Sequence, residues 1–286
     1  AGPILFYSMN LTQDLPKISC LMVTAKGRFH HVQRSLRCYL DQTYPNRELI
    51  IVNEGPDEYQ AQIDAHLQKL QRPDIRTVWL RGNYTLGALR NISVALCSGD
   101  LFCQWDDDDF CTPQRLSTQF SFMAHRPWCK VCYLSDQLHY YFKQKMLYWD
   151  DWKAYASQGI KRCSLIPGTL MAYKRIWTDW KVRYPSGGKY ARAGEDTFLA
   201  DSLIDRNYDA VMLLGGVGYM HVYTHHGTNQ VFNHDHHILI SDMRSRYREQ
   251  IVKHRYQISS SLDYFDFGEV KVMCRDGLVF THGGDR

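Results

Sequence analysis

The 286-residue sequence lacks any run of about 18 uncharged apolar residues, so it offers no candidate segment for crossing a bilayer. It also lacks internal repeats and low-complexity tracts. The formal net charge is only +4 and is spread along the chain, which argues against a nucleic-acid partner. With 44% hydrophobic and 22% charged residues, the composition is ordinary for a folded globular protein.

The nine cysteines lack the spacing of a disulfide framework. Cys129 and Cys132 form one CxxC pair, but no second pair follows at the spacing of a structural zinc site. Cys20 and Cys103 lie within apolar runs, where a free thiol packs as a small hydrophobic group. We therefore expect reduced cysteines and a cytoplasmic location, with peripheral membrane contact left open.

Short apolar strands alternate with helices over the first 110 residues. Strands are expected over Ile18–Val23, Glu48–Val52, Ile75–Leu80 and Leu101–Trp105, with helices over 29–40, 57–71 and 87–96. This alternation predicts a mostly parallel sheet covered by helices on both faces. Ligands bind such sheets at the carboxyl ends of the strands, which places Thr24, Glu54 and the run Asp106–Asp109 near one crevice.

The pattern changes after about residue 110. The segments 131–134 and 138–149 suggest antiparallel strands, 196–205 a helix, and 210–214 and 218–223 further strands. Residues 238–256 predict one amphipathic basic helix, and a β-hairpin is expected around Arg275-Asp276-Gly277. We predict a peripheral leader (1–17), a main domain (18–230) divided at residue 110, and a C-terminal extension (231–286).

Four consecutive carboxylates, Asp106–Asp109, follow the strand expected to end at Trp105. Such carboxylates repel one another strongly unless a cation neutralises them. Mg²⁺ and Mn²⁺ prefer oxygen ligands and commonly join protein carboxylates to phosphates. An exposed acidic turn is the alternative. Because the preceding strand directs the run toward the crevice, we favour a divalent-metal site.

Two further groups of side chains are candidates for catalysis or metal binding. Asp196 lies at an expected helix start beside Glu195, where it serves either as a cap of the helix or as a general base. The histidines at 221, 225, 226, 234, 236 and 237 match no common structural-zinc spacing. We expect most of them on the surface or in loops, with one joining an aspartate at a shared metal as the more economical functional role.

Five segments occur in the order of one known family. They are Ile18–Gly55 with its intact Gln42–Asn46 (QTYPN), Gly87–Asn91 (GALRN), Asp106–Asp109 with Pro113, Glu195-Asp196 with Leu199, and His226–Asn229. Over residues 18 to 230 they resemble the opening, the G-x-x-x-R-N segment, the DxD motif, the E-D-x-x-L motif and a closing histidine segment of family 2 glycosyltransferases.

The resemblance implies the GT-A α/β fold, with a Rossmann-like nucleotide-sugar-binding half (18–110) around a central mixed sheet. An acceptor half (111–230) and a C-terminal helix and β-hairpin would follow. It implies inverting, metal-dependent transfer from a nucleotide-diphosphate sugar, with a UDP-sugar favoured and Mn²⁺ or Mg²⁺ as cofactor. The acceptor would be a hydroxyl of a glycan, a lipid-linked molecule or a protein.

The resemblance also implies residue roles. The donor would be contacted by Thr24, Lys26, Glu54, Arg90, Asp106 and Asp107, and the sugar pocket would be floored by Ile166–Thr169. Asp108 would bind the metal, with His226 as a further candidate ligand, and Asp196 would be the base, with Glu195 shaping the acceptor site. Asn53-Glu54 stands where an acidic pair is usual, and Lys26 where an aromatic residue is frequent, so the nucleotide's identity stays open.

Two alternatives remain at this stage. A non-catalytic protein on the same fold would bind a sugar nucleotide or a glycan without transfer, and the intact Asp196 argues against it. A metal-dependent phosphohydrolase would use the same aspartates, but the sequence has no phosphate-cradling P-loop.

Overall fold

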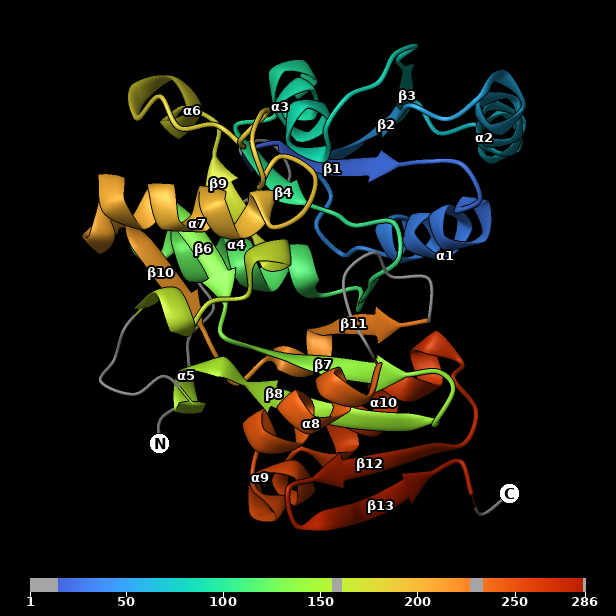
Figure 1. Cartoon of the computed structure of the whole chain (residues 1–286), viewed down its shortest axis with the longest axis vertical. Helices are drawn as coiled ribbons and strands as arrows, with labels where there is room; N and C mark the ends of the chain where they lie inside the picture. The colour runs from blue at the N-terminus through green and yellow to red at the C-terminus, as the bar shows by residue number, and fades with distance from the viewer. Residues whose placement is uncertain (1–14, 156–160, 227–233, 285–286) are drawn as a thin grey trace.

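The computed structural model describes residues 15–155, 161–226 and 234–284, and within them two mixed β-sheets lie one below the other (Figure 1). The strands of the seven-stranded sheet, in spatial order, are β10 (Val211–Leu214), β6 (Val131–Leu134), β9 (Met171–Tyr173), β4 (Leu101–Gln104), β1 (Ile18–Thr24), β2 (Arg47–Asn53) and β3 (Ile75–Trp79). Only β9 runs antiparallel to its neighbours, β4 and β6. The expected mostly parallel sheet is therefore confirmed.

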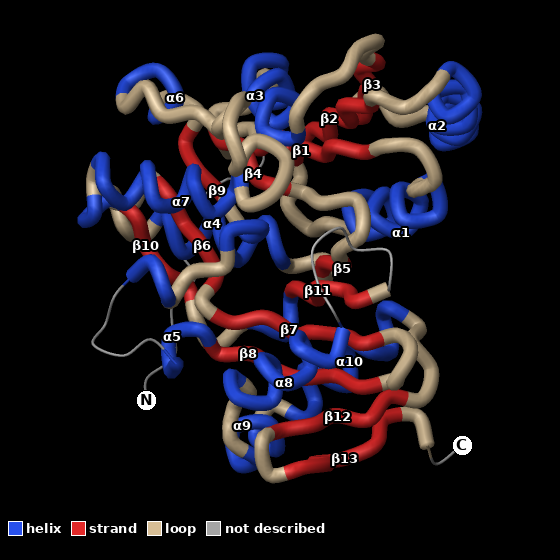
Figure 2. Tube along the Cα trace, in the orientation of Figure 1, coloured by secondary structure: helices blue, strands red, loops and turns tan. Residues whose placement is uncertain are grey.

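The second sheet contains the C-terminal hairpin. Its six strands, in spatial order, are β13 (Gly277–His282), β12 (Val270–Cys274), β8 (Met146–Asp151), β7 (Asp136–Tyr141), β11 (His221–His225) and β5 (Phe110–Cys111). The single strand expected over 138–149 forms two strands, β7 and β8, which pair antiparallel with each other, and the segment 131–134 lies in the other sheet as β6. β12 adds to β8 in parallel. Figure 2 shows β12 and β13 at the free edge of this sheet, so the hairpin extends the sheet rather than standing apart from it.

The helices expected over 29–40, 57–71, 87–96 and 196–205 are confirmed to within one residue at each end, whereas helices over 115–124, 152–155 and 176–179 were not expected. Helices surround both sheets. They are α1 (Phe29–Leu40), α2 (Asp57–Leu70), α3 (Leu86–Leu96), α4 (Arg115–Ala124), α5 (Trp152–Tyr155), α6 (Ile176–Asp179), α7 (Glu195–Arg206), α8 (His234–Arg244), α9 (Arg248–Lys253) and α10 (Arg255–Phe265). Short 3₁₀ turns cover Lys161–Cys163, Pro167–Thr169, Tyr208–Ala210 and Gly218–Met220. In the described part of the chain, no helix is both long and apolar enough to span a membrane.

The core follows from the alternation of side chains along β1. Ile18, Cys20 and Met22 belong to one buried cluster, and Leu21, on the other face of the strand, belongs to a second. The first cluster continues through both sheets and reaches Val272 in β12. The hairpin is therefore part of a shared hydrophobic core.

Two expected elements are wrong in detail. The single helix over 238–256 is divided into α8, α9 and α10, with a first break at Ser245 and Arg246 and a second at His254. Ser245 forms a β-bridge with Asp150, and Arg246 Nη2 pairs with Asp136 at 2.8 Å, so tertiary contacts override helical periodicity. The strand expected over 218–223 begins only at His221, because Gly218–Met220 forms a 3₁₀ turn. The division of the chain into leader, main domain and extension stays a prediction, and residues 1–14 of the leader lie outside the described residues.

The shared core gives a stability prediction. Val272→Ala removes buried methyl groups from β12 and should lower the free energy of unfolding by roughly 1.5–2.5 kcal/mol. The matched control is Lys271→Ala, because Lys271 lies on the exposed face of the same strand. Urea unfolding of both variants measures the difference, and equal stability would show that the hairpin contributes no core packing.

Candidate active site

The acidic run follows β4 at the carboxyl edge of the seven-stranded sheet. Because β4 pairs in parallel with β1, the residues that follow the two strands meet there. Thr24, the last residue of β1, donates its hydroxyl to Asp107 Oδ2 at 2.7 Å and also contacts the Tyr59 hydroxyl at 2.7 Å. Ser35 in α1 donates to the Asp106 carbonyl. The run is therefore fixed from the first strand and the first helix.

Arg28 stands between two of the four carboxylates. It belongs to the turn after β1, and its Nε donates to Asp107 Oδ2 at 2.8 Å. Its Nη2 lies 2.5 Å from Asp107 Oδ1 and 2.6 Å from Asp108 Oδ2. The repulsion within the acidic run is thus relieved in part by the protein's own guanidinium, and a metal ion is not the only cation that can do so.

Asp108 is also joined to His226, which follows β11. His226 Nε2 lies 3.1 Å from Asp108 Oδ2, and Thr224 donates to the Asp108 carbonyl. Burial alone would raise the pKa of Asp108, but the hydrogen bond with His226 and the Arg28 guanidinium lower that pKa below its ordinary value. Asp108 is therefore a carboxylate in its charged form, with its side chain 19% exposed.

Asp109 differs from its neighbours. It is buried, its Oδ1 has no hydrogen-bond partner among the described residues, and His221 Nε2 lies 3.5 Å from its Oδ2. Burial and the Asp108 and Asp106 carboxylates raise the pKa of Asp109 well above its ordinary value. The four aspartates thus occupy distinct environments, and Asp109 points into the protein.

Arg90, in α3, connects the acidic run to the start of α7. Its Nη2 lies 3.0 Å from Asp106 Oδ1, and its Nε donates to Glu195 Oε1 at 2.8 Å. Gln104 Nε2 also donates to Asp106, at 2.9 Å. Arg90 and Glu195 are both buried, so this bridge fixes the distance between the two acidic segments.

Asp196 lies beside Glu195 and is only partly buried. The cap residue of α7 is Gly194, so Asp196 is the second residue of the helix and not its cap, although its Oδ1 accepts from Thr197 N at 2.7 Å. Desolvation, together with the Glu195 carboxylate, raises the pKa of Asp196 to about 6. A carboxylate with such a pKa is suited to accept a proton near neutral pH.

The other expected donor contacts lie around this edge. Lys26 is exposed in the turn after β1, and Glu54, after β2, accepts from the Tyr84 amide at 3.2 Å. Gly168, in the expected floor segment, faces Asp106, because a Cβ atom there would lie 3.3 Å from Asp106 Oδ2. The expected residues thus lie along one edge of the sheet. The polar groups of Thr24 and Arg90, however, are hydrogen-bonded to other residues of the protein.

Two of the six histidines are exceptions to the expectation that most of them lie on the surface or in loops. His221 and His225 are buried in β11, where His225 Nε2 lies 3.0 Å from His139 Nδ1. The side chain of His234 and the residues Gly227–Asn229 lie outside the described residues.

Three side chains of the site were not predicted from the sequence, namely Arg28, Tyr59 and Gln104. Of these, Arg28 had a usable signal, because it is a cation in the turn after the first expected strand, and the run of four carboxylates follows a strand expected in the same sheet. Tyr59 and Gln104 carry no comparable pattern in the sequence.

Asp108 and His226 fit a divalent ion as two of its ligands. Ligand atoms at adjacent octahedral positions about 2.1 Å from such an ion lie about 3 Å apart, and the two side-chain atoms are 3.1 Å apart. Across 15–155, 161–226 and 234–284, no group of three or more His, Cys, Asp or Glu side chains suits a metal. A protein that supplies one or two ligands leaves the other positions to phosphate and water, which is usual for Mg²⁺.

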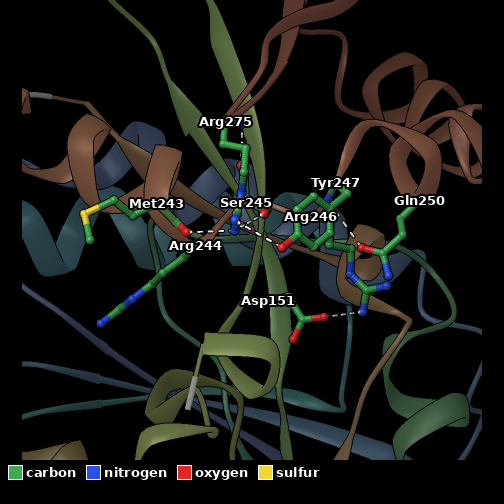
Figure 3. Close-up of a pocket in the computed structure, with 8 residues that line it drawn as sticks. All are labelled: Asp151, Met243, Arg244, Ser245, Arg246, Tyr247, Gln250 and Arg275. Atoms are coloured by element: carbon green, nitrogen blue, oxygen red, sulfur yellow. Dashed lines mark hydrogen bonds and ion pairs between the residues drawn. The ribbon is translucent and has the colours of Figure 1, made fainter. Parts of the chain in front are cut away.

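A separate pocket of about 250 Å³ lies in the C-terminal part, between the end of β8, the break after α8 and the hairpin (Figure 3). Its arginines are engaged by the protein. Arg246 pairs with Asp151 at 2.9 Å, and Arg275 Nη2 donates to the Met243 carbonyl at 3.1 Å. The contact of Arg275 with Met243 joins the hairpin to α8. None of the aspartates of the acidic run lines this pocket.

Comparison with known proteins identifies the family. A family model described as glycosyl transferase family 2 matches residues 20–173, more than half of the chain. The chain therefore belongs to glycosyl transferase family 2.

Curated relatives match over a shorter part. An uncharacterized glycosyltransferase of Haemophilus influenzae is 28% identical over 103 residues, which cover 35% of this chain and 31% of that protein. The putative colanic acid biosynthesis glycosyl transferase WcaA of Escherichia coli is 33% identical over 111 residues, which cover 39% of this chain and 38% of that protein. The match thus spans well under half the length of these relatives.

Solved structures share the fold. TarS of S. aureus in complex with UDP-GlcNAc superposes with a TM-score of 0.56 at 12% identity, covering 87% of this chain and 80% of that chain. The mannosyltransferase PcManGT from Pyrobaculum calidifontis, in complex with GDP-Man and Mn²⁺, gives 0.55 at 13% identity, covering 88% and 65%. At these identities the likeness shows the fold alone, and the expected GT-A fold is confirmed.

The Arg90 bridge gives a prediction on stability. Arg90→Met leaves the buried Glu195 carboxylate without its cation and should lower the free energy of unfolding by roughly 3–5 kcal/mol. Adding Glu195→Gln removes the unpaired charge and should recover part of that loss. Urea unfolding of the single and double variants tests this, and a loss of less than about 1 kcal/mol would show a pair no stronger than an exposed one.

Proposed function

We propose that this protein is an inverting glycosyltransferase that moves a sugar from a nucleoside-diphosphate donor to an acceptor hydroxyl. The main support is the Arg90 bridge, which joins Asp106 in the acidic run to Glu195, the neighbour of Asp196. A site for the leaving group and a candidate base then belong to one connected network at one edge of the sheet. Membership of the family supports the transferase class independently.

On the donor side, Asp108 and His226 would hold a divalent ion, Mn²⁺ or Mg²⁺. Asp106 and Asp107 contact the ribose, and Lys26 and Glu54 line the nucleoside. Thr24 and Arg90 act as positioning residues, because their polar groups orient Asp107 and Asp106. A bound divalent ion would neutralise the charge that develops on the leaving diphosphate.

On the acceptor side, Asp196 accepts the proton of the acceptor hydroxyl. As that proton moves, the acceptor oxygen forms its bond to the anomeric carbon, and the bond from this carbon to the diphosphate oxygen breaks. The electron pair of the broken bond leaves with the diphosphate. With the base and the leaving group on opposite sides of the sugar, one displacement would invert the anomeric configuration.

The donor class is supported by the neighbouring structures, one of which holds UDP-GlcNAc and another GDP-Man with Mn²⁺. We favour a UDP-sugar for this chain. A screen of UDP- and GDP-sugars, with and without Mn²⁺, scored by nucleoside-diphosphate release and by product analysis, tests the function. Transfer to an acceptor supports it, whereas hydrolysis alone points to a phosphohydrolase, and binding without turnover points to a non-catalytic protein.

The ion site gives a binding prediction. Asp108→Asn keeps the shape of the side chain but removes its charge, so Mn²⁺-dependent affinity for UDP or GDP should fall by at least about tenfold, the loss expected for one charged interaction. Isothermal titration calorimetry with and without Mn²⁺ measures it, and Asp57→Asn, at an exposed aspartate, is the matched control. Unchanged nucleotide affinity in Asp108→Asn would remove Asp108 from the site.

The base gives a kinetic prediction. Asp196→Asn should leave folding and donor affinity nearly intact while transfer falls on the order of 10²–10⁴-fold, the usual contribution of a positioned acid–base group. Because the base must be deprotonated and its pKa is about 6, kcat/KM of the parent should rise as pH increases through that value.

Asp201→Asn is the matched control for the base, since Asp201 lies on the same helix and pairs with Arg162 outside the site. This variant should keep both the rate and the pH profile of the parent. Turnover of Asp196→Asn within a few-fold of the parent would instead direct attention to Glu195.

A further inference from the structure

The Arg28 guanidinium contacts the carboxylate on which the proposed ion site depends. Its Nη2 lies 2.6 Å from Asp108 Oδ2, and His226 Nε2 lies 3.1 Å from the same oxygen. One oxygen atom therefore contacts both an arginine and the second proposed ligand of the ion.

A divalent ion held by Asp108 and His226 would lie within a few ångströms of this guanidinium. Two cations that close repel each other strongly in a partly buried site, where water screens them poorly. The side chains of Arg28 and Asp108 are 25% and 19% exposed. The ion and the Arg28–Asp108 contact therefore exclude each other.

Arg28 has a stronger hold on Asp107 than on Asp108. Its Nε donates to both oxygens of Asp107, at 3.0 and 2.8 Å, and its Nη2 donates to Oδ1 at 2.5 Å. Asp107 is buried and also receives the Thr24 hydroxyl. Asp107 thus anchors the guanidinium, and Asp108 is the contact that can be exchanged.

A diphosphate is a suitable replacement for the Asp108 contact. Its oxygens match the planar donors of a guanidinium, and its charge offsets both the ion and the arginine. We propose that Arg28 competes with the divalent ion for Asp108, and that the donor's diphosphate relieves this competition by accepting the guanidinium. The inference rests on the proposed function and deepens it. The ion then binds weakly alone and tightly with the nucleotide. By linkage, the ion raises the affinity for the nucleotide by the same factor.

The test is a Mn²⁺ titration followed by electron paramagnetic resonance of the free ion, alone and with UDP or GDP. For the parent, the nucleotide should raise Mn²⁺ affinity by roughly 5- to 150-fold, the usual range of such coupling. Arg28→Gln should bind Mn²⁺ more tightly than the parent without nucleotide, and its gain on adding nucleotide should shrink. Arg28→Lys should also raise the Mn²⁺ affinity without nucleotide and reduce the gain on adding nucleotide. Both changes should be smaller than in Arg28→Gln, because one ammonium can stay with Asp107.

Arg37→Gln is the matched control. Arg37 lies in α1, is largely exposed and is paired with Asp41, so its loss should leave both Mn²⁺ affinities unchanged. Circular dichroism confirms that each variant is folded, and Arg28→Lys keeps the test decisive if Arg28→Gln does not fold.

Two results would overturn the proposal, and they are distinguishable. If folded Arg28 variants bind Mn²⁺ alone no more tightly than the parent, Arg28 is not a competitor, and the ion site itself is unaffected. If the parent binds no Mn²⁺ with or without either nucleotide, the proposed ion site is wrong and the competition with it.

Discussion

Mutual repulsion among four consecutive carboxylates is the constraint around which this site is organised. The repulsion is relieved in three ways. Asp106 pairs with Arg90, Asp107 and Asp108 share Arg28, and Asp109 is buried with a raised pKa. The two arginines come from α3 and from the turn after β1. The acidic run therefore determines which surrounding elements must carry positive charge, and the same pairings fix the run in place.

The two ends of the proposed reaction are held together by buried charge. Arg90 contacts the acidic run with one nitrogen and the start of α7 with another, so α7 cannot shift without straining Asp106. Asp196 owes its raised pKa to desolvation and to Glu195, and Glu195 is held in place by Arg90. The basicity of the candidate base is thus tied to the ion pair that positions the donor side.

The sequence was sufficient to predict those strands and helices whose pattern of residues is local. Apolar runs and helical spacing predicted β1, β2, α1, α2 and the C-terminal hairpin, because each depends on residues close in the chain. It failed where tertiary contacts decide, as at Arg246, whose pairing with Asp136 ends α8. The charge of Arg28 was visible in the sequence, but its pairing with Asp107 was not, because the two residues are 79 positions apart.

The pairing of Asp108 with His226 has a consequence for how the protein is made. The two residues are 118 positions apart, and His226 directly follows β11, which pairs with β5 and β7. During synthesis from the N-terminus, the acidic run leaves the ribosome long before its histidine. Arg28, in the turn after β1, is made before the run, so β4 needs only to pair with β1 for the run to gain a counter-charge in the absence of its histidine.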